Sequence, residues 1–194
     1  MASSDCTPSI PPAETQPGKD KQATEPPEVQ LPKLSAEDFR VYNRLAVMME
    51  AYHNHFRHTW SMLYKAASSG SRPAGLSIRQ YLNAGLQLSR QLTMHHTIEE
   101  QYVFPELATR MPIFGDHDQL INQHHEIHEG LVRMEDYLKA CLHGDKELRM
   151  EELKLVMDSF GDVLWTHLDL EVKQLQADSM RRYWSKAEIM GMNW

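Results

Sequence analysis

Histidines and glutamates recur along this chain at spacings that suit metal binding. In each of three pairs the two residues stand four apart, and residues four apart in an α-helix lie on the same face, one turn from each other. Imidazole nitrogens and carboxylate oxygens at this spacing can hold iron or zinc. With one further histidine, the candidate metal ligands are His53, His95, Glu99, His124, His128, His167 and Glu171.

The candidates lie in the rows of residues, spaced by three and four, that face the interior of a helical bundle. Leu92, His95 and Glu99 follow this spacing, which selects His95 over His96 as the inward-pointing residue. The same row continues to Tyr102, which is therefore expected to point inward as well. The same rule places His128 inward together with the histidine one turn before it. Burying five imidazoles and two carboxylates without a cation would be costly, so the sequence predicts a dinuclear iron site between packed helices.

The elements that position these residues are four long helices. Apolar periodicity, capping residues and breakers predict helices over residues 35–68, 77–110, 116–142 and 146–178. Pro105 lies inside the second helix and is expected to kink it. Ser185 and Glu188 have the spacing of a capping box, which predicts a short C-terminal helix. Because the connections are short, the fold class is predicted to be all-α, an antiparallel up-down-up-down four-helix bundle.

The N-terminal segment differs in composition from the rest of the chain. Residues 1–33 hold seven of the ten prolines among polar side chains, a mixture that buries too little apolar area to offset the entropy of ordering. The expected organisation is a disordered tail over residues 1–33 and one domain over residues 34–194.

Charge and hydropathy exclude several classes of protein. A net charge of −7 argues against a nucleic-acid or anionic membrane surface. No apolar run approaches the roughly 18 residues of a membrane-spanning helix, and the N-terminus lacks the pattern of a signal peptide. The two cysteines, Cys6 and Cys141, are too few for a disulfide framework. We therefore expect a soluble cytoplasmic protein, whose oligomeric state the sequence leaves open.

Longer motifs around the same residues resemble the hemerythrin-like, HHE cation-binding family, and its fungal-type branch most. The matching segments are HN at residues 53–54, HHTIEEQYVFPEL at 95–107, QHHEIHEGL at 123–131 and HLDLEV at 167–172. The resemblance covers roughly residues 40–175, nearly the whole predicted domain, and the HxxxEExxxxFP block is its most specific part.

The resemblance implies how the ligands divide between two iron ions bridged by an oxo or hydroxo group. His124, His128 and His167 would hold one iron and His53 and His95 the other, with Glu99 and Glu171 bridging the pair. Zinc or manganese can occupy the same ligands in a purified sample. One position of the second iron would stay open for dioxygen or a similar small diatomic ligand.

The resemblance thus implies reversible binding of dioxygen or a related small molecule, in storage, sensing or detoxification. One departure bears on this expectation. The oxygen-carrying hemerythrins have an aspartate five residues after the last histidine, whereas here Glu171 follows His167 by four and Val172 takes the fifth place. The alternatives are a di-iron oxidase, peroxidase or nitric-oxide-handling enzyme, for which Tyr102 is the candidate redox side chain, and an iron-buffering module.

Overall fold

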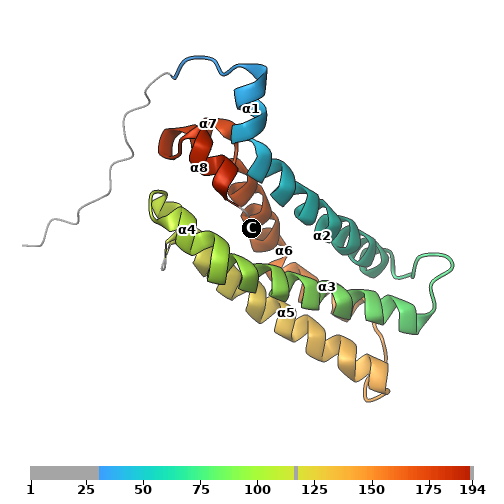
Figure 1. The fold of residues 1–194 in the computed structure, drawn as a ribbon. Helices are drawn as coiled ribbons and strands as arrows, with labels where there is room; N and C mark the ends of the chain where they lie inside the picture. The colour runs from blue at the N-terminus through green and yellow to red at the C-terminus, as the bar shows by residue number, and fades with distance from the viewer. Residues whose placement is uncertain (1–30, 116–117, 193–194) are drawn as a thin grey trace, which may run out of the picture. The chain divides into compact units, whose positions relative to one another are not determined.

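Four long antiparallel helices form the bundle in a computed structural model that describes residues 31–115 and 118–192. They are α2 (Arg44–Ser69), α3 (Ile78–Ile98), α5 (Gln119–His143) and α6 (Met150–Gln174). Helices α2 and α5 each pack against both α3 and α6, so the four surround a common interior (Figure 1). The described residues contain no strand. The predicted all-α four-helix bundle is confirmed. All but the last three residues of the predicted tail, 1–33, lie outside the described residues.

Shorter helices complete the structure. They are α1 (Ala36–Tyr42), a π-helical turn (Glu99–Val103), α4 (Phe104–Ala108), a 3-10 turn (Pro112–Phe114), α7 (Ala177–Tyr183) and α8 (Lys186–Gly191). Helix α1 packs against α7 and α8 at one end of the bundle (Figure 1).

Several helix ends follow the predicted capping signals. The Ser35 hydroxyl accepts a hydrogen bond from the Asp38 backbone amide at the start of α1, and Gly144 ends α5 with a φ of 86°. Ser185 and Glu188 form the predicted capping box of α8. The first predicted helix, however, is broken at Asn43, whose side-chain oxygen accepts a hydrogen bond from the Ala177 amide. This contact ties the junction of α1 and α2 to the start of α7.

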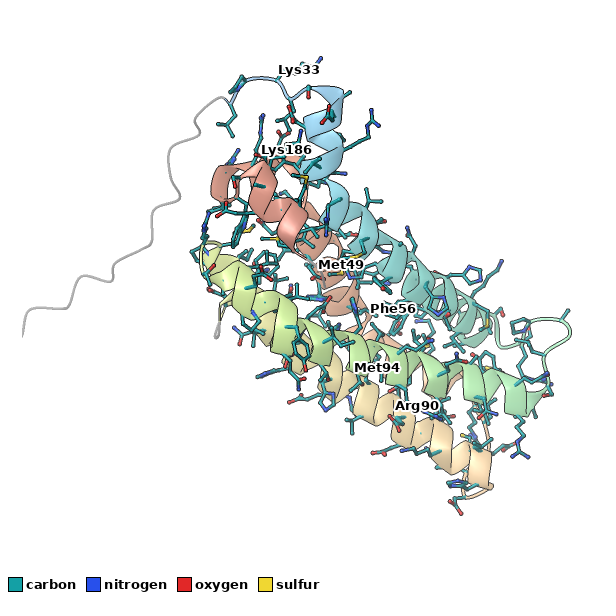
Figure 2. The ribbon with its side chains drawn as sticks, in the orientation of Figure 1. Lys33, Met49, Phe56, Arg90, Met94 and Lys186 are labelled. Atoms are coloured by element: carbon teal, nitrogen blue, oxygen red, sulfur yellow. The ribbon has the colours of Figure 1, made fainter. Side chains whose placement is uncertain are left out.

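The apolar core is divided into two clusters. One surrounds Trp60 and Leu63 in the C-terminal half of α2, and the other gathers residues of α2, α4, α7 and α8 around Leu45. Met49 belongs to the apolar cluster around Leu45, and Phe56 belongs to the apolar cluster around Trp60 and Leu63 (Figure 2). His53 stands between them in the sequence and is fully buried. The buried candidate ligands therefore form a polar layer between two apolar regions, and they are His53, Glu99, His124, His167 and Glu171.

The predicted kink at Pro105 takes the form of a π-helical turn. The Phe104 amide donates to the Glu99 carbonyl five residues before it, and this wider turn precedes Pro105, which has no amide proton for an ordinary helical bond. The extra residue shifts the inward-facing row to Val103 and Phe104, which are buried. Tyr102 is 63% exposed. The expectation that Tyr102 continues the inward row is therefore wrong.

Helices α5 and α6 approach closely at Gly130. A Cβ atom at this position would lie 2.2 Å from the Phe160 Cγ atom, and Phe160 is buried, so its ring has little room to move. We expect Gly130→Ala to lower the free energy of unfolding by about 1–3 kcal/mol, the usual cost of overpacking a core.

Thermal unfolding measures this effect, with an expected fall of about 2–4 °C in Tm per kcal/mol for a chain of this size. Gly191→Ala is the matched control, because a Cβ there meets nothing within 4 Å. An unchanged Tm in the Gly130 variant would contradict the tight packing.

Candidate metal centre

The polar layer contains two groups of donors that could each hold one metal ion. We call the group of His53, His95, Glu99 and Glu171 the first cluster. The second cluster is His96, Glu99, His124 and His167. Within each cluster one donor atom per residue lies within 4.8 Å of all the others. Glu99 belongs to both clusters, so its carboxylate is placed to bridge two ions.

Taken together, the two clusters contain residues from all four bundle helices. Helix α2 supplies His53, α3 supplies His95 and His96, α5 supplies His124, and α6 supplies His167 and Glu171, while Glu99 begins the π-helical turn. Because residues from four different helices converge, the site exists only when the bundle is assembled.

Donor atoms in the first cluster lie close to one another. His53 Nε2 is 3.2 Å from both His95 Nε2 and Glu171 Oε2. His95 Nε2 lies 2.9 Å from Glu99 Oε1. A metal ion bound in the first cluster would have two imidazoles and two carboxylates around it.

The second cluster is richer in imidazole. His124 Nε2 lies 3.2 Å from His167 Nε2 and 3.6 Å from Glu99 Oε2. The His96 ring stacks on the His124 ring with centroids 3.9 Å apart. His167 Nε2 is also 3.8 Å from Glu171 Oε2, so the two clusters touch through Glu171 as well as through Glu99.

Hydrogen bonds behind the rings set the orientation of two histidines. His53 Nδ1 lies 3.1 Å from the Leu168 carbonyl oxygen, which can only accept, so Nδ1 carries the proton. His124 Nδ1 lies 2.7 Å from Glu100 Oε1 in the same way. A neutral ring that donates from Nδ1 keeps a lone pair on Nε2, and this is the usual arrangement behind a metal-bound histidine. In both rings Nε2 is the atom that points into its cluster.

Several buried nitrogen and oxygen atoms of the polar layer have no hydrogen-bond partner. They are both carboxylate oxygens of Glu99, both of Glu171, His96 Nε2 and His167 Nδ1. Leaving such groups unsatisfied in an apolar interior is costly. A pair of cations would compensate the carboxylates and the lone pairs together. The chemistry and burial of these residues therefore fit a metal centre.

Burial keeps four histidines of the layer neutral. Desolvation lowers the pKa of His95 to about 4 and that of His167 to about 3, and it also lowers the pKa of His96 and His124. A neutral imidazole is the form that binds metal. Burial and the nearby Glu171 carboxylate raise the pKa of Glu99 well above its ordinary value.

The structure brings six of the seven predicted ligands into the two clusters and leaves His128 outside. The inward row of α5 is Leu120, His124, Ile127 and Leu131, all buried, and it passes beside His128, which is exposed. The predicted inward orientation of His128 is therefore not found. His96, which the sequence analysis set aside, is buried and joins the second cluster.

A longer stretch of sequence contains the signal for both differences. On α5 the apolar row from Leu120 to Leu138 steps regularly by four and three through Ile127. On α3 the steps from Leu92 through His96 to Glu99 are four and three, as regular as the row through His95. Both histidines of α3 flank the inward face, and each reaches a different cluster.

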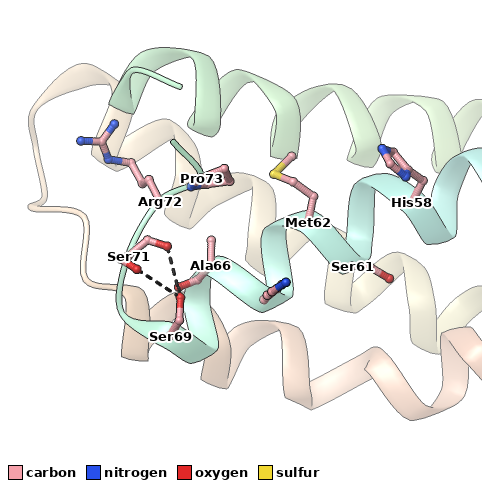
Figure 3. Close-up of a pocket in the computed structure, with 9 residues that line it drawn as sticks. His58, Ser61, Met62, Ala66, Ser69, Ser71, Arg72 and Pro73 are labelled. Atoms are coloured by element: carbon pink, nitrogen blue, oxygen red, sulfur yellow. Dashed lines mark hydrogen bonds between the residues drawn. The ribbon is translucent and has the colours of Figure 1, made fainter. Parts of the chain in front are cut away.

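Aromatic rings line the polar layer. Phe56 lies 5.0 Å from the His95 ring, and Phe104 stacks on His124 with centroids 5.2 Å apart. A separate depression beside the C-terminal half of α2, bordered by His58, Met62 and Pro73, contains no cluster residue (Figure 3). That depression therefore has no part in either cluster.

The lowered histidine pKa values predict a pH dependence of stability for the metal-free protein. Below the ordinary histidine pKa of 6.5, these histidines become protonated in the unfolded chain but stay neutral in the folded protein. The free energy of unfolding therefore falls as the pH falls. Glu99, with its raised pKa, acts in the opposite direction but is one group against four. We expect the Tm of metal-free protein to drop by at least about 5 °C between pH 7 and pH 5.

Calorimetry in chelator-treated buffer measures this dependence. A Tm that is flat or rises over the same interval would contradict the neutral state of the buried histidines.

Comparison with known proteins agrees with this geometry. The chain is 31% identical over 102 residues to the "Dimeric xanthone biosynthesis cluster protein R11" of Cryptosporiopsis sp. (strain 8999). The match covers 48% of this chain and 37% of that protein, so it spans little more than a third of the relative. This relative is consistent with the predicted fungal-type branch. No solved structure matches the chain significantly.

Among the described residues, no helix is long and apolar enough to cross a membrane. The family model of the hemerythrin HHE cation binding domain matches residues 44–177. This region begins with α2, ends at the start of α7 and contains every residue of the two clusters. Together with the motifs that led to the same expectation, the match shows that the chain belongs to the hemerythrin HHE cation-binding domain family.

Proposed function

We propose that this chain is a non-heme di-iron protein of the hemerythrin type, with one iron ion in each cluster. The observation that carries the proposal is the position of Glu99, a buried carboxylate shared by two sets of donors. Imidazole and carboxylate donors without thiolates suit iron, and zinc or manganese can bind the same atoms in a purified sample. An oxo or hydroxo bridge between the ions is part of the proposal.

We further propose that the centre binds dioxygen or a related small molecule reversibly, in storage, sensing or detoxification. Two iron ions, when bound, supply electrons and a coordination position for such a ligand. The chain contributes the surroundings. Phe56 and Phe104 lie against the rings of His95 and His124, and the buried carboxylates of Glu99 and Glu171 are shielded from bulk water. A cytoplasmic location remains a prediction from the sequence.

An enzyme that uses the same centre is the second candidate. The name of the fungal relative associates that protein with a biosynthesis cluster, which favours a catalytic role for the domain. Tyr102, the candidate redox side chain, is 63% exposed and is not part of either cluster. The catalytic alternative therefore needs a redox partner other than Tyr102.

Metal analysis combined with optical spectroscopy tests the two candidates. We expect two iron ions per chain, and a charge-transfer band that appears on exposure of the reduced protein to air and disappears when the gas is removed. Air oxidation with continued turnover and release of peroxide would instead support the enzyme. A chain that retains neither iron nor another divalent cation would overturn the di-iron proposal.

Replacing His96 tests the composition of the second cluster. We expect His96→Ala to retain about one ion per chain, because the second cluster loses one of its four donors, and to lose part of the Tm increase that metal provides. His58→Ala is the control, since His58 is an exposed histidine of α2 outside both clusters. Full metal content in the His96 variant would remove His96 from the ligand set.

A further inference from the structure

A cavity lies between α3 and α5, beside the centre described above. Its volume is about 390 Å³, and eight residues line it: Thr93, His96, Thr97, Glu100, His124, His125, His128 and Glu129. Four histidines and two glutamates are therefore among the residues that line it. Their chemistry is that of cation ligands.

The floor of this cavity is the second cluster itself. His96 and His124 line the cavity and also belong to that cluster. His96 is only 5% exposed, and its Nε2 atom has no hydrogen-bond partner. The cavity therefore leads from the surface to an unsatisfied buried donor.

The rim carries exposed side chains that attract cations. Three of them, His125, His128 and Glu129, belong to α5, and the fourth, Glu100, belongs to the π-helical turn; all four are exposed. Glu100 also accepts the hydrogen bond from His124 Nδ1, so it connects the rim to a buried ligand. In residues 31–115 and 118–192 the only groups of donors close enough to hold an ion are the two buried clusters. The rim is thus not a finished binding site.

The opposite side of α3 has a different character. There His95 of the first cluster is the partly exposed ligand, with 12% of its side chain accessible. Its ring lies 5.9 Å from the Tyr52 ring and 5.0 Å from the Phe56 ring. Met94, next to His95, is 66% exposed (Figure 2). Aromatic and thioether side chains suit a hydrated cation less well than carboxylates and imidazoles do.

We propose that the cavity between α3 and α5 is the uptake route for divalent metal ions, and that His128 and Glu129 capture the ion in transit. The carboxylate of Glu129 and the lone pair of His128 replace part of the water shell of the ion. The ion then passes to His124 and His96 on the floor of the cavity. His128 accelerates loading without being a ligand of the resident ion. This inference rests on the proposed metal-binding function.

Loading kinetics of the full chain test the route. Metal-free protein is mixed anaerobically with Fe²⁺, and separately with Co²⁺, and the rate of uptake is followed by absorbance at several salt concentrations. The test variant is His128→Ala combined with Glu129→Gln. The matched control is His58→Ala combined with Glu126→Gln, which removes an exposed histidine and an exposed glutamate that do not line the cavity. Final metal content and Tm are measured for every sample.

We expect the uptake rate of the test variant to fall about fivefold or more, with a weaker salt dependence, because charged groups at the edge of a site act mainly on association rates. Its final metal content and metal-dependent gain in Tm should equal those of the wild type. The control variant should load at the wild-type rate.

Two results would overturn the proposal. An unchanged uptake rate would show that ions reach the centre elsewhere, and a final content reduced by one ion would make His128 a resident ligand. In both cases the wild type still loads two ions, so the proposed function survives. A wild type that takes up no ion would instead overturn the proposed function itself.

Discussion

The burial of a polar layer between two apolar regions is the constraint on which this structure depends. Glu99 and Glu171 are at most 1% exposed and lie in the middle of a helical bundle. An ionised carboxylate in such a place costs several kcal/mol unless charge or hydrogen bonds compensate it. Burial holds His95, His96, His124 and His167 neutral, so these rings supply no such charge. Two cations bound among these residues would balance the layer and let the surrounding helices pack as an ordinary bundle.

The π-helical turn at Glu99–Val103 is the irregular part of the backbone that carries a ligand of the polar layer. Glu99 at the start of the turn and Val103 at its end are both buried, and Pro105 follows without an amide proton for an ordinary helical bond. Such turns are rare and often occur at functional sites. Here the turn begins at the one carboxylate that both clusters share, which links an irregular backbone directly to the chemistry of the site.

The sequence was sufficient for the fold and for most of the site, because long apolar rows and capping residues act locally. Asn43 interrupts the first predicted helix through a contact with Ala177, more than a hundred residues away, which no local pattern contains. The inward placement of His128, and the choice of His95 alone over His96, differ from the structure for another reason. Over four residues, steps of three and four are both compatible with a helix face, and only the full row from Leu120 to Leu138 settles which face is buried.

The two clusters differ in donor type, and this difference bears on what the centre binds. The first cluster offers two imidazoles and two carboxylates, and the second offers three imidazoles and the shared Glu99. Anionic oxygen donors stabilise the higher charge of a metal ion more than neutral nitrogen donors do. Two carboxylates together neutralise only half of the charge of two divalent ions. In the proposed centre a bridging hydroxide would neutralise one further charge, and the charge that remains would favour a small ligand that is anionic or becomes so by accepting electrons, as dioxygen does.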